Sequence, residues 1–115
     1  MTKSRAQPED SPLGTFEEQV MLAVVRTGNE AYAMNIRREL EQVTARSVAI
    51  GSVYVTLDRL EAKGLIASTR AQRHDTISRR MFVVTATGVR ALSETRAMRE
   101  RLWDGVELRR LLKNT

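Results

Sequence analysis

The sequence predicts a mainly α-helical fold that contains one small β-hairpin, and three observations support this class. Apolar residues recur at the three- and four-residue spacing of a helix in three successive stretches. Two short stretches that follow are rich in β-branched and aromatic residues, with a polar connection between them. The C-terminal part then returns to helical spacing. The 115 residues suffice for one domain, which we divide into a disordered tail (1–12), a helical domain with the hairpin (13–84) and a C-terminal helix (85–115).

The composition favours a cytoplasmic protein that binds a polyanion. The net charge is +5 and the isoelectric point is about 10.4, and a basic domain of this kind attracts nucleic acid. Aromatic residues make up only 4% of the chain, fewer than stacking on single strands would need. The absence of cysteine excludes disulfides and thiolate metal sites. No stretch is long and apolar enough to cross a membrane, and residues 1–12 lack the apolar core of a signal peptide.

Residues 13–26 are predicted to form the first helix, which is apolar on more than one side. One face holds Leu13, Phe16, Val20, Ala23 and Val24. The other faces hold Met21, Leu22 and Val25. A helix of this kind needs cover on several sides. Two interpretations are open, a central core helix or a helix that a second subunit partly covers. We favour the second because so short a chain cannot surround a helix fully.

A turn at residues 27–30 and a second helix over residues 32–43 follow. Glycine and asparagine are typical of the turn. The inward face of the second helix is predicted to hold Ala33, Ile36, Leu40 and Val43. Arg37 and Arg38 point to solvent or to phosphate. Two neighbouring glutamates make the charge of this face mixed, which favours an ordinary solvated surface.

Residues 47–64 contain the third helix, around which the rest of the chain is organised. Its core face holds Ile50, Val53, Leu57 and Leu60. The opposite face holds Gly51, Ser52, Val55, Asp58, Arg59 and Ala62, with Tyr54, Thr56 and Lys63 on its flanks. A small, hydroxyl-rich first half can enter a DNA major groove and reach phosphates or base edges. The alternative is an ordinary amphipathic helix, but its pairing with the second helix makes a helix-turn-helix pattern.

Residues 65–70 and 79–84 are predicted to be the two strands of a hairpin, joined by a polar connection at residues 71–78. A hairpin after a helix-turn-helix is a wing, so the unit is a winged helix-turn-helix. Its basic residues, opposed within this segment only by Asp75, are Arg70, Arg73, His74, Arg79 and Arg80. We predict that Arg73 and His74 contact DNA. Arg79 and Arg80 could instead protect the strand edge, and for Arg80 the sequence does not decide. A lone histidine supports neither a metal site nor histidine catalysis.

The last helix is predicted to start at the N-cap Thr85 and to end or bend at Gly105. One face holds Val89, Leu92, Trp103 and Val106, with Ala91, Met98 and Leu102 at its edge and with Arg96 and Arg99 as interruptions. Little of the domain is left to cover this helix, so we expect it to pair with a second subunit as a dimerisation helix. Trp103 would then be an interface anchor. The alternative is that Trp103 forms the wall of a site for a flat hydrophobic ligand.

Three segments, residues 32–40, 50–65 and 79–88, together resemble the PadR family of bacterial transcriptional regulators. The middle segment is the most specific, with its order of glycine, serine, valine and tyrosine followed by leucine, arginine, leucine and glutamate. The chain departs from the family pattern at several positions. Ala33 stands in place of a glycine and Val55 in place of a frequent proline, a Met81–Phe82 pair replaces two tyrosines, Ala86 and Thr87 replace a glutamate-containing cap, and the wing lacks a glycine-rich tip.

The resemblance implies a homodimer that represses transcription from a pseudo-palindromic operator on double-stranded DNA and that a small hydrophobic effector can release. The residues it implies for DNA binding are Tyr32, Asn35, Gly51, Ser52, Tyr54, Thr56, Arg59, Arg73 and His74. Those for an effector site or the dimer interface are Leu22, Met98, Leu102 and Trp103.

A winged-helix module that binds a partner protein, without sequence-specific DNA binding, is the alternative function. Basic residues scattered evenly over the surface would favour it, whereas they gather in residues 70–80. An enzyme is not expected, because the sequence contains no nucleophile–base pair, no glycine-rich phosphate loop and no cluster with metal-ligand spacing. No cofactor is expected either.

Overall fold

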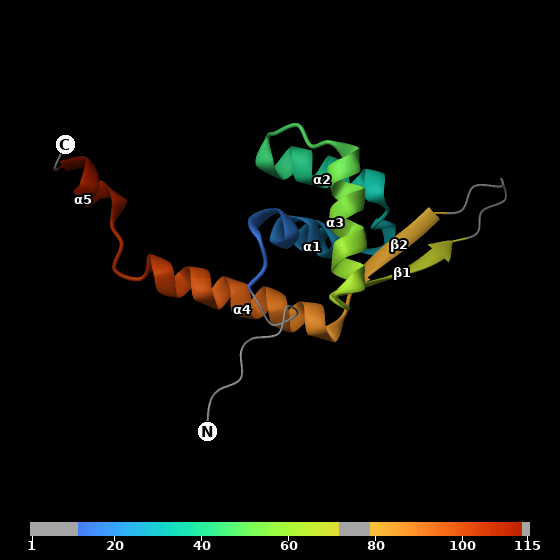
Figure 1. The fold of residues 1–115 in the computed structure, drawn as a ribbon. Coiled ribbons are helices and arrows are strands. Elements are labelled where there is room, and N and C mark those ends of the chain that lie inside the picture. Colours follow the sequence, from blue (N-terminus) through green and yellow to red (C-terminus); the bar gives the residue numbers. More distant parts are fainter. Residues whose placement is uncertain (1–11, 72–78, 114–115) are drawn as a thin grey trace, which may run out of the picture.

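The structure, a computed structural model, describes residues 12–71 and 79–113. In order along the chain, the elements are α1 (Thr15–Thr27), the 3-10 helix η2 (Gly28–Glu30), α2 (Ala33–Thr44), α3 (Ile50–Ala62), β1 (Ile66–Ala71), β2 (Arg79–Val84), α4 (Ala86–Trp103) and α5 (Leu108–Lys113). Figure 1 shows α3 beside the hairpin and α4 running away from both. The predicted fold class, helical with an antiparallel two-stranded hairpin, is therefore confirmed. Residues 1–11 of the predicted tail and residues 72–78 of the predicted connection, which carry Arg73 and His74, lie outside the described residues.

A single core lies where α1, α2 and α3 meet the hairpin. Val20 of α1, Ile36 of α2 and Leu57 of α3 come from the predicted inward faces, and all three are fully buried. Phe82 of β2 closes the core, and its backbone N–H donates to the carbonyl oxygen of Ala31 at 3.0 Å. The helical spacing of the apolar residues therefore identifies the faces that pack.

The last turn of α2 differs from the prediction, because Val43 is exposed and not inward. Leu40 is the last buried position of this helix. Ala45 then ends α2 in the left-handed conformation, with a φ of 58°. Val43 thus falls in the turn where the chain leaves the core and swings toward α3.

Helix α1 is buried on one side and open on another. Its buried residues include Val20, Met21 and Val24, while Leu22 and Val25 are exposed. Leu13, predicted as the first residue of this helix, lies just before it and is buried. The described chain therefore does not enclose α1 on all sides.

The hairpin pairs in a continuous antiparallel register, from Ile66 opposite Val84 to Ala71 opposite Arg79. Alternate residues of a strand share a face, so the cross-strand pairs Ser68–Phe82 and Arg70–Arg80 lie on one side of the hairpin. Tyr32, just before α2, makes an isolated bridge to Met81 of β2. The start of α2 is thereby held against the edge of the wing.

Helix α4 begins as predicted, and its small residues form the face that packs on the body. The Thr85 hydroxyl caps it by accepting the N–H of Gly88 at 3.1 Å. The buried residues are Gly88, Ala91 and Thr95, whereas Val89 is 57% exposed. A Cβ at Gly88 would lie only 2.1 Å from the carbonyl oxygen of Leu65. The small residues therefore face the body because α4 approaches the backbone closely there, and this close approach turns Val89 outward.

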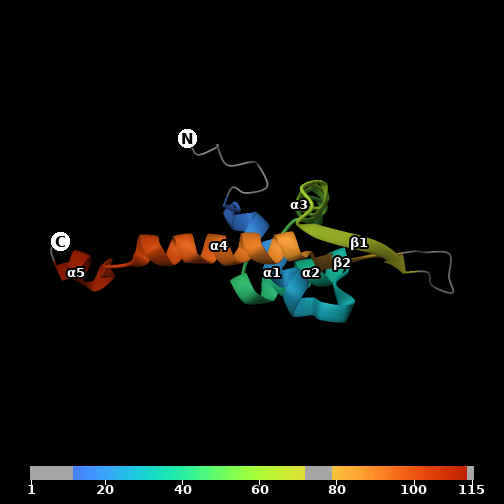
Figure 2. The ribbon, with the colours of Figure 1, turned by 90° about the horizontal axis from the view of Figure 1, so that it is seen from below.

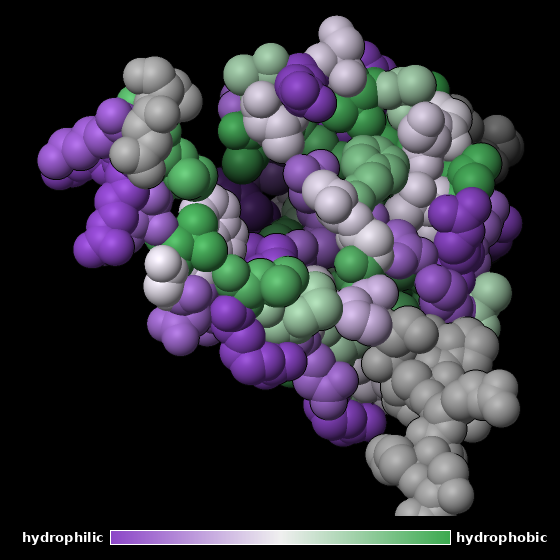
Figure 3. Space-filling model, turned by 60° about the vertical axis from the view of Figure 1, so that its left-hand side comes forward, coloured by the Kyte–Doolittle hydropathy of each residue, from purple (hydrophilic) through white to green (hydrophobic). Residues whose placement is uncertain are grey.

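The end of the chain extends away from the rest of the fold (Figure 2). Helix α4 ends at Trp103, and Gly105 follows in a turn with a φ of 78°, so the predicted end or bend at this glycine is confirmed. Residues 99–113 are all exposed, and apolar side chains are visible on the surface here (Figure 3). We call residues 99–113 the arm and the other described residues the body. No helix in residues 12–71 or 79–113 is long and apolar enough to cross a membrane.

Candidate nucleic-acid interface

The exposed face of α3 holds most of the residues predicted to contact DNA. Gly51, Ser52 and Arg59 are exposed, and Tyr54 is 46% exposed. A Cβ built at Gly51 would meet nothing within 4 Å, so the start of the helix presents a low, open surface. On the other side of α3, Val53 and Leu60 are completely buried and hold the helix on the core. The fold thus presents a small, hydroxyl-bearing helix face to an incoming ligand.

Thr56 does not belong to this face, which corrects the prediction for it. Thr56 is only 5% exposed and lies on the same side of α3 as Val53 and Leu60. At about 100° per residue, position 56 lies about 40° from residue 60 and about 60° from residue 53, so it borders the buried side of the helix. A threonine is small and apolar enough at its methyl group to pack there, so Thr56 supports the helix and does not face a ligand.

The start of α2 contributes a second group of polar side chains. Asn35 is bonded at both ends of its amide: its Nδ2 donates to the Glu30 carbonyl oxygen at 2.9 Å, and its Oδ1 accepts from Arg38 Nη1 at 2.8 Å. Asn35 therefore stabilises the turn before α2 and fixes the position of the Arg38 guanidinium. Tyr32 lies under a guanidinium, with Arg79 Cζ 5.1 Å from the centre of its ring. This distance is within the range of a cation–π contact.

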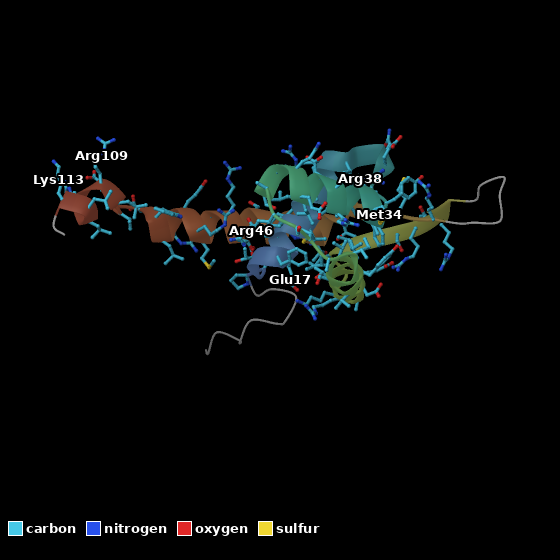
Figure 4. The ribbon with its side chains drawn as sticks, turned by 90° about the horizontal axis from the view of Figure 1, so that it is seen from above. Glu17, Met34, Arg38, Arg46, Arg109 and Lys113 are labelled. Atoms are coloured by element: carbon cyan, nitrogen blue, oxygen red, sulfur yellow. The ribbon has the colours of Figure 1, made fainter. Side chains whose placement is uncertain are left out.

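The polar groups at the start of α2 line one cleft together with Tyr54 of α3 and the hairpin, with a volume of about 420 Å³, whereas Gly51, Ser52 and Arg59 lie outside it. Its lining residues are Tyr32, Ala33, Met34, Asn35, Arg38, Tyr54, Arg70, Arg79, Arg80 and Phe82. We call it the basic cleft, because all its charged lining residues are arginines. Figure 4 shows Met34 and Arg38 on this side of the molecule, far from Arg109 and Lys113 on α5. The sequence pattern missed Arg38 and Arg79 as members of one site, because they come from different elements.

Arg80 differs from the other arginines of the basic cleft in having two carboxylate partners on α3. Its Nη1 donates to Asp58 Oδ1 at 3.1 Å, and its Nη2 donates to Glu61 Oε1. Glu61 also accepts the Ser68 hydroxyl at 2.8 Å through its other oxygen. Partial burial acts to lower the pKa of Arg80, but the hydrogen bonds and charges of Asp58 and Glu61 outweigh it and raise that pKa. The guanidinium is thus firmly charged and already paired with two acids that come from α3 and not from the wing segment itself.

The residues predicted for an effector site or a dimer interface are dispersed. Leu22 lines a cleft between α1 and α4 together with Leu92 and Arg96. Met98 lines a separate cleft with Pro12 and Glu94. Leu102 and Trp103 lie in the last turn of α4, where they are 69% and 56% exposed. Within one chain, the four residues therefore do not form one pocket.

Comparisons with known proteins agree with this architecture. Residues 21–94 match the model of the transcriptional regulator PadR-like family. A PadR-like transcription factor from Bacteroides fragilis has a similar structure, with a TM-score of 0.70 and 26% identity over 79% of this chain and 85% of that one. A PadR family transcriptional regulator from Eggerthella lenta DSM 2243 is also similar, with a TM-score of 0.65 and 27% identity over 84% of this chain and 82% of that one.

Bacillus subtilis PadR, solved in complex with operator DNA, shares the fold with a TM-score of 0.62 and 19% identity over 72% of this chain and 47% of that one. Comparison with curated protein sequences gives no match. The family match covers more than half of the chain and includes the whole unit from α2 to β2. The chain therefore belongs to the PadR-like family of transcriptional regulators.

Proposed function

We propose that this protein is a DNA-binding transcriptional regulator that places α3 in the major groove and phosphates against the basic cleft. The observation that carries the proposal is the basic cleft itself, where arginines from α2 and the hairpin converge beside the exposed Tyr54. Arginine side chains that gather along a helix able to enter a groove match the charge and shape of duplex DNA. The operator complex of Bacillus subtilis PadR, a protein of the same fold, is consistent with this use.

In this proposal the exposed residues of α3 make the contacts that read DNA sequence. Gly51 lets the helix start approach the backbone closely, Ser52 and Tyr54 donate hydroxyls, and Arg59 extends from the next turns. Tyr32 and Asn35 act less directly, since they position Arg79 and Arg38. Arg73 and His74 of the wing connection are proposed to reach phosphate or the minor groove.

We further propose that the protein acts as a homodimer whose interface includes α4 and α5. Leu102, Trp103, Leu111 and Leu112 are all exposed along the arm, where a second copy would cover them. A two-fold axis between two winged helices matches a pseudo-palindromic operator. Such a dimer bound over a promoter would repress transcription.

Release by a small hydrophobic effector completes the proposed mechanism. Leu22 and Met98 line clefts beside α4, and Trp103 presents a flat apolar surface in its last turn. Pairing of two chains would bring a second set of these side chains to the same region. Because the chain has one tryptophan, the fluorescence of Trp103 reports directly on any planar aromatic compound that binds there.

The substitution Tyr54→Ala tests the DNA-binding face. We expect it to weaken binding to a duplex, selected by the wild-type protein from a randomised pool, by about 1–3 kcal/mol, or roughly 5- to 150-fold. The melting temperature should change by less than about 2 °C, because the side chain is half-exposed. Arg26→Gln is the control, since it removes a positive charge from the last turn of α1, outside the basic cleft and outside the proposed interface of α4 and α5.

Three results would count against this assignment of Tyr54. Unchanged affinity would mean that Tyr54 makes no contact with DNA. A large loss of thermal stability would make Tyr54 a packing residue. An equal loss of affinity in the Arg26→Gln control would show a general effect of net charge and not a local interface.

A further inference from the structure

We propose that Arg80 is a positioning residue, which fastens the hairpin to α3 through Asp58 and Glu61 and does not itself hold a DNA phosphate. This inference rests on the proposed function, because fastening matters for DNA binding only if α3 and the hairpin bind one duplex together. It separates Arg80 from Arg79, its neighbour in the same strand with the same charge and a different set of contacts.

Arg80 donates hydrogen bonds to carboxylates of the protein through the two terminal nitrogens that would otherwise bind a phosphate. One arm of the guanidinium donates to Asp58 and the other donates to Glu61. Its face lies over the Phe82 ring, with Arg80 Cζ 4.9 Å from the ring centre. A guanidinium is a planar fork that can bridge two acceptors while it stacks on an aromatic ring. Both terminal nitrogens of the Arg80 guanidinium are therefore paired with carboxylates of the protein.

The two acceptors sit where such a fork can span them. Asp58 and Glu61 are three residues apart on α3, so their side chains project from the same side of the helix, one turn apart. Glu61 also accepts the hydroxyl of Ser68 from the other strand at 2.8 Å. Both strands of the hairpin are thus tied to the same turn of α3.

The hairpin needs this tie because it carries part of the basic cleft. A two-stranded hairpin is only marginally stable by itself, and this one also places Arg70 directly opposite Arg80, a like-charge pair that opposes strand pairing. Asp58 and Glu61 offset that repulsion. Arg79 is carried by the hairpin while Tyr54 is carried by α3, so their separation across the cleft depends on how the two elements are joined.

Charge-conserving variants distinguish a fastener from a phosphate contact. Lysine keeps the positive charge and can hold a phosphate, but its single ammonium group does not reproduce the two-armed bridge. The test compares Arg80→Lys, Arg80→Gln and the matched control Arg26→Lys, which changes an arginine that pairs with Glu39 outside the basic cleft. The probe is the duplex that the wild-type protein selects from a randomised pool, and circular dichroism checks that each variant is folded.

We expect Arg80→Lys and Arg80→Gln to weaken binding by similar factors, each roughly tenfold, while Arg26→Lys stays within about threefold of the wild type. The double variant Asp58→Asn with Glu61→Gln should also weaken binding, although it removes two negative charges. Combining it with Arg80→Gln should add no more than about threefold, because residues that act through one contact are not additive.

Hydrogen exchange of the free protein provides a readout that needs no DNA. In Arg80→Lys, the amides of β1 and β2 should exchange about tenfold faster than in the wild type, while those of α1 keep their protection. If the wild-type protein selects no duplex, the proposed function fails, and the exchange experiment still decides whether Arg80 fastens the hairpin.

Several results would overturn the proposal. Wild-type binding by Arg80→Lys together with weak binding by Arg80→Gln would overturn it, because that pattern belongs to a phosphate contact. An Asp58→Asn, Glu61→Gln variant that binds as tightly as or more tightly than the wild type would show that the pairing contributes nothing to binding. Unchanged exchange in the hairpin amides of Arg80→Lys would mean that the contact does not fasten the wing.

Discussion

The body and the arm use apolar residues in opposite ways. In the body, side chains such as Val20, Ile36 and Leu57 are completely buried, and Phe82 is 1% exposed. In the arm, every residue from 99 to 113 is exposed, including Trp103. The body therefore buries a hydrophobic core within one chain, although some of its apolar residues, such as Leu22 and Val89, are exposed. The described chain offers the arm no comparable core.

This difference has an energetic consequence. Full burial of a leucine or valine side chain contributes about 1.5–3 kcal/mol relative to exposure, and the arm gains none of this while its leucines face solvent. Helix α5 has only 6 residues, too few to be stable by itself in water. The arm thus carries exposed apolar side chains and a helix too short to be stable alone, and contact with a partner surface would stabilise both. This supports the proposed dimer.

Two polar contacts join α4 to residues at or just before the start of α1. The backbone N–H of Leu13 donates to the Thr95 hydroxyl at 3.0 Å. One turn further, Arg99 Nη2 pairs with Glu18 Oε2 of α1 at 2.5 Å. Beyond Arg99 the arm is exposed throughout. The direction in which the arm leaves the body is therefore set at the start of α1.

The largest expected effect comes from emptying the core of the body. We expect Phe82→Ala to lower the free energy of unfolding by about 3–5 kcal/mol, because it leaves a cavity where α3 and the hairpin meet α1. Leu102→Ala, on the exposed side of the arm, should change the unfolding of the dilute monomer by less than about 0.5 kcal/mol. Urea denaturation followed by circular dichroism measures both, and equal losses would erase the distinction between body and arm.

A matched pair of glycine substitutions sharpens the same contrast. A Cβ at Gly88 would lie 2.1 Å from Leu65 O and 2.7 Å from Val84 Cγ1, so Gly88→Ala should cost about 3 kcal/mol or more. A Cβ at Gly105 meets nothing within 4 Å. Gly105→Ala should cost about 1–2 kcal/mol of local strain at its positive φ and leave the melting transition of the body in place. A fully stable Gly88→Ala protein would contradict the close packing of α4 on the hairpin.

Trp103 is expected to affect association and not the fold of the body. If a second copy covers it, Trp103→Ala should raise the dissociation constant of the dimer by about 30-fold, the equivalent of about 2 kcal/mol. Sedimentation equilibrium over a range of concentrations gives this constant. A wild-type mass near 13 kDa at micromolar concentration would contradict the dimer itself.

The smallest expected effect depends on pH and concerns Glu17 at the start of α1. Partial burial acts to raise the pKa of Glu17, but the Gly14 N–H at 3.0 Å and Lys63 Nζ at 2.9 Å outweigh it and hold that pKa below its ordinary value. A lowered carboxyl pKa means that the ionised form stabilises the folded state. This contribution is present above the ordinary pKa and is lost as the pH falls through the lowered one.

We therefore expect Glu17→Gln to cost about 1 kcal/mol at pH 7 and progressively less as the pH falls below the ordinary carboxyl pKa. Glu100→Gln, which breaks the exposed Arg96–Glu100 pair on α4, should cost less than about 0.5 kcal/mol at either pH. Urea denaturation at pH 7 and pH 3 makes the comparison. A cost for Glu17→Gln that does not change with pH would rule out the charge as its cause.

The sequence predicts those parts of the fold that depend on local periodicity. The spacing of Val53, Leu57 and Leu60 identifies the buried side of α3, and the preference of threonine for N-caps identifies Thr85 as the start of α4. The exposed face of α3, with Ser52 and Tyr54, follows from the same pattern. These features are set by residues a few positions apart, so a single sequence contains them.

What the sequence does not predict depends on how distant segments meet. Thr56 carries a hydroxyl but packs inward, because the buried arc of α3 is wide enough to include it. The packing face of α4 follows from the close approach of Gly88 to Leu65, 23 residues earlier in the numbering. Arg80 finds partners 22 and 19 positions away in Asp58 and Glu61. The type of a side chain alone does not predict such contacts between residues that are distant in the sequence.

The most direct test of the account is a titration of the selected duplex and of its scrambled sequence, at several salt concentrations, with the stoichiometry of the complex measured. The account predicts tight, sequence-dependent binding by two subunits per duplex. If each subunit neutralises three to five phosphates, log affinity should fall with log salt at a slope of roughly −5 to −9. Equal affinity for both duplexes, or no binding at low salt, would contradict the claim that the body reads DNA while the arm pairs two chains.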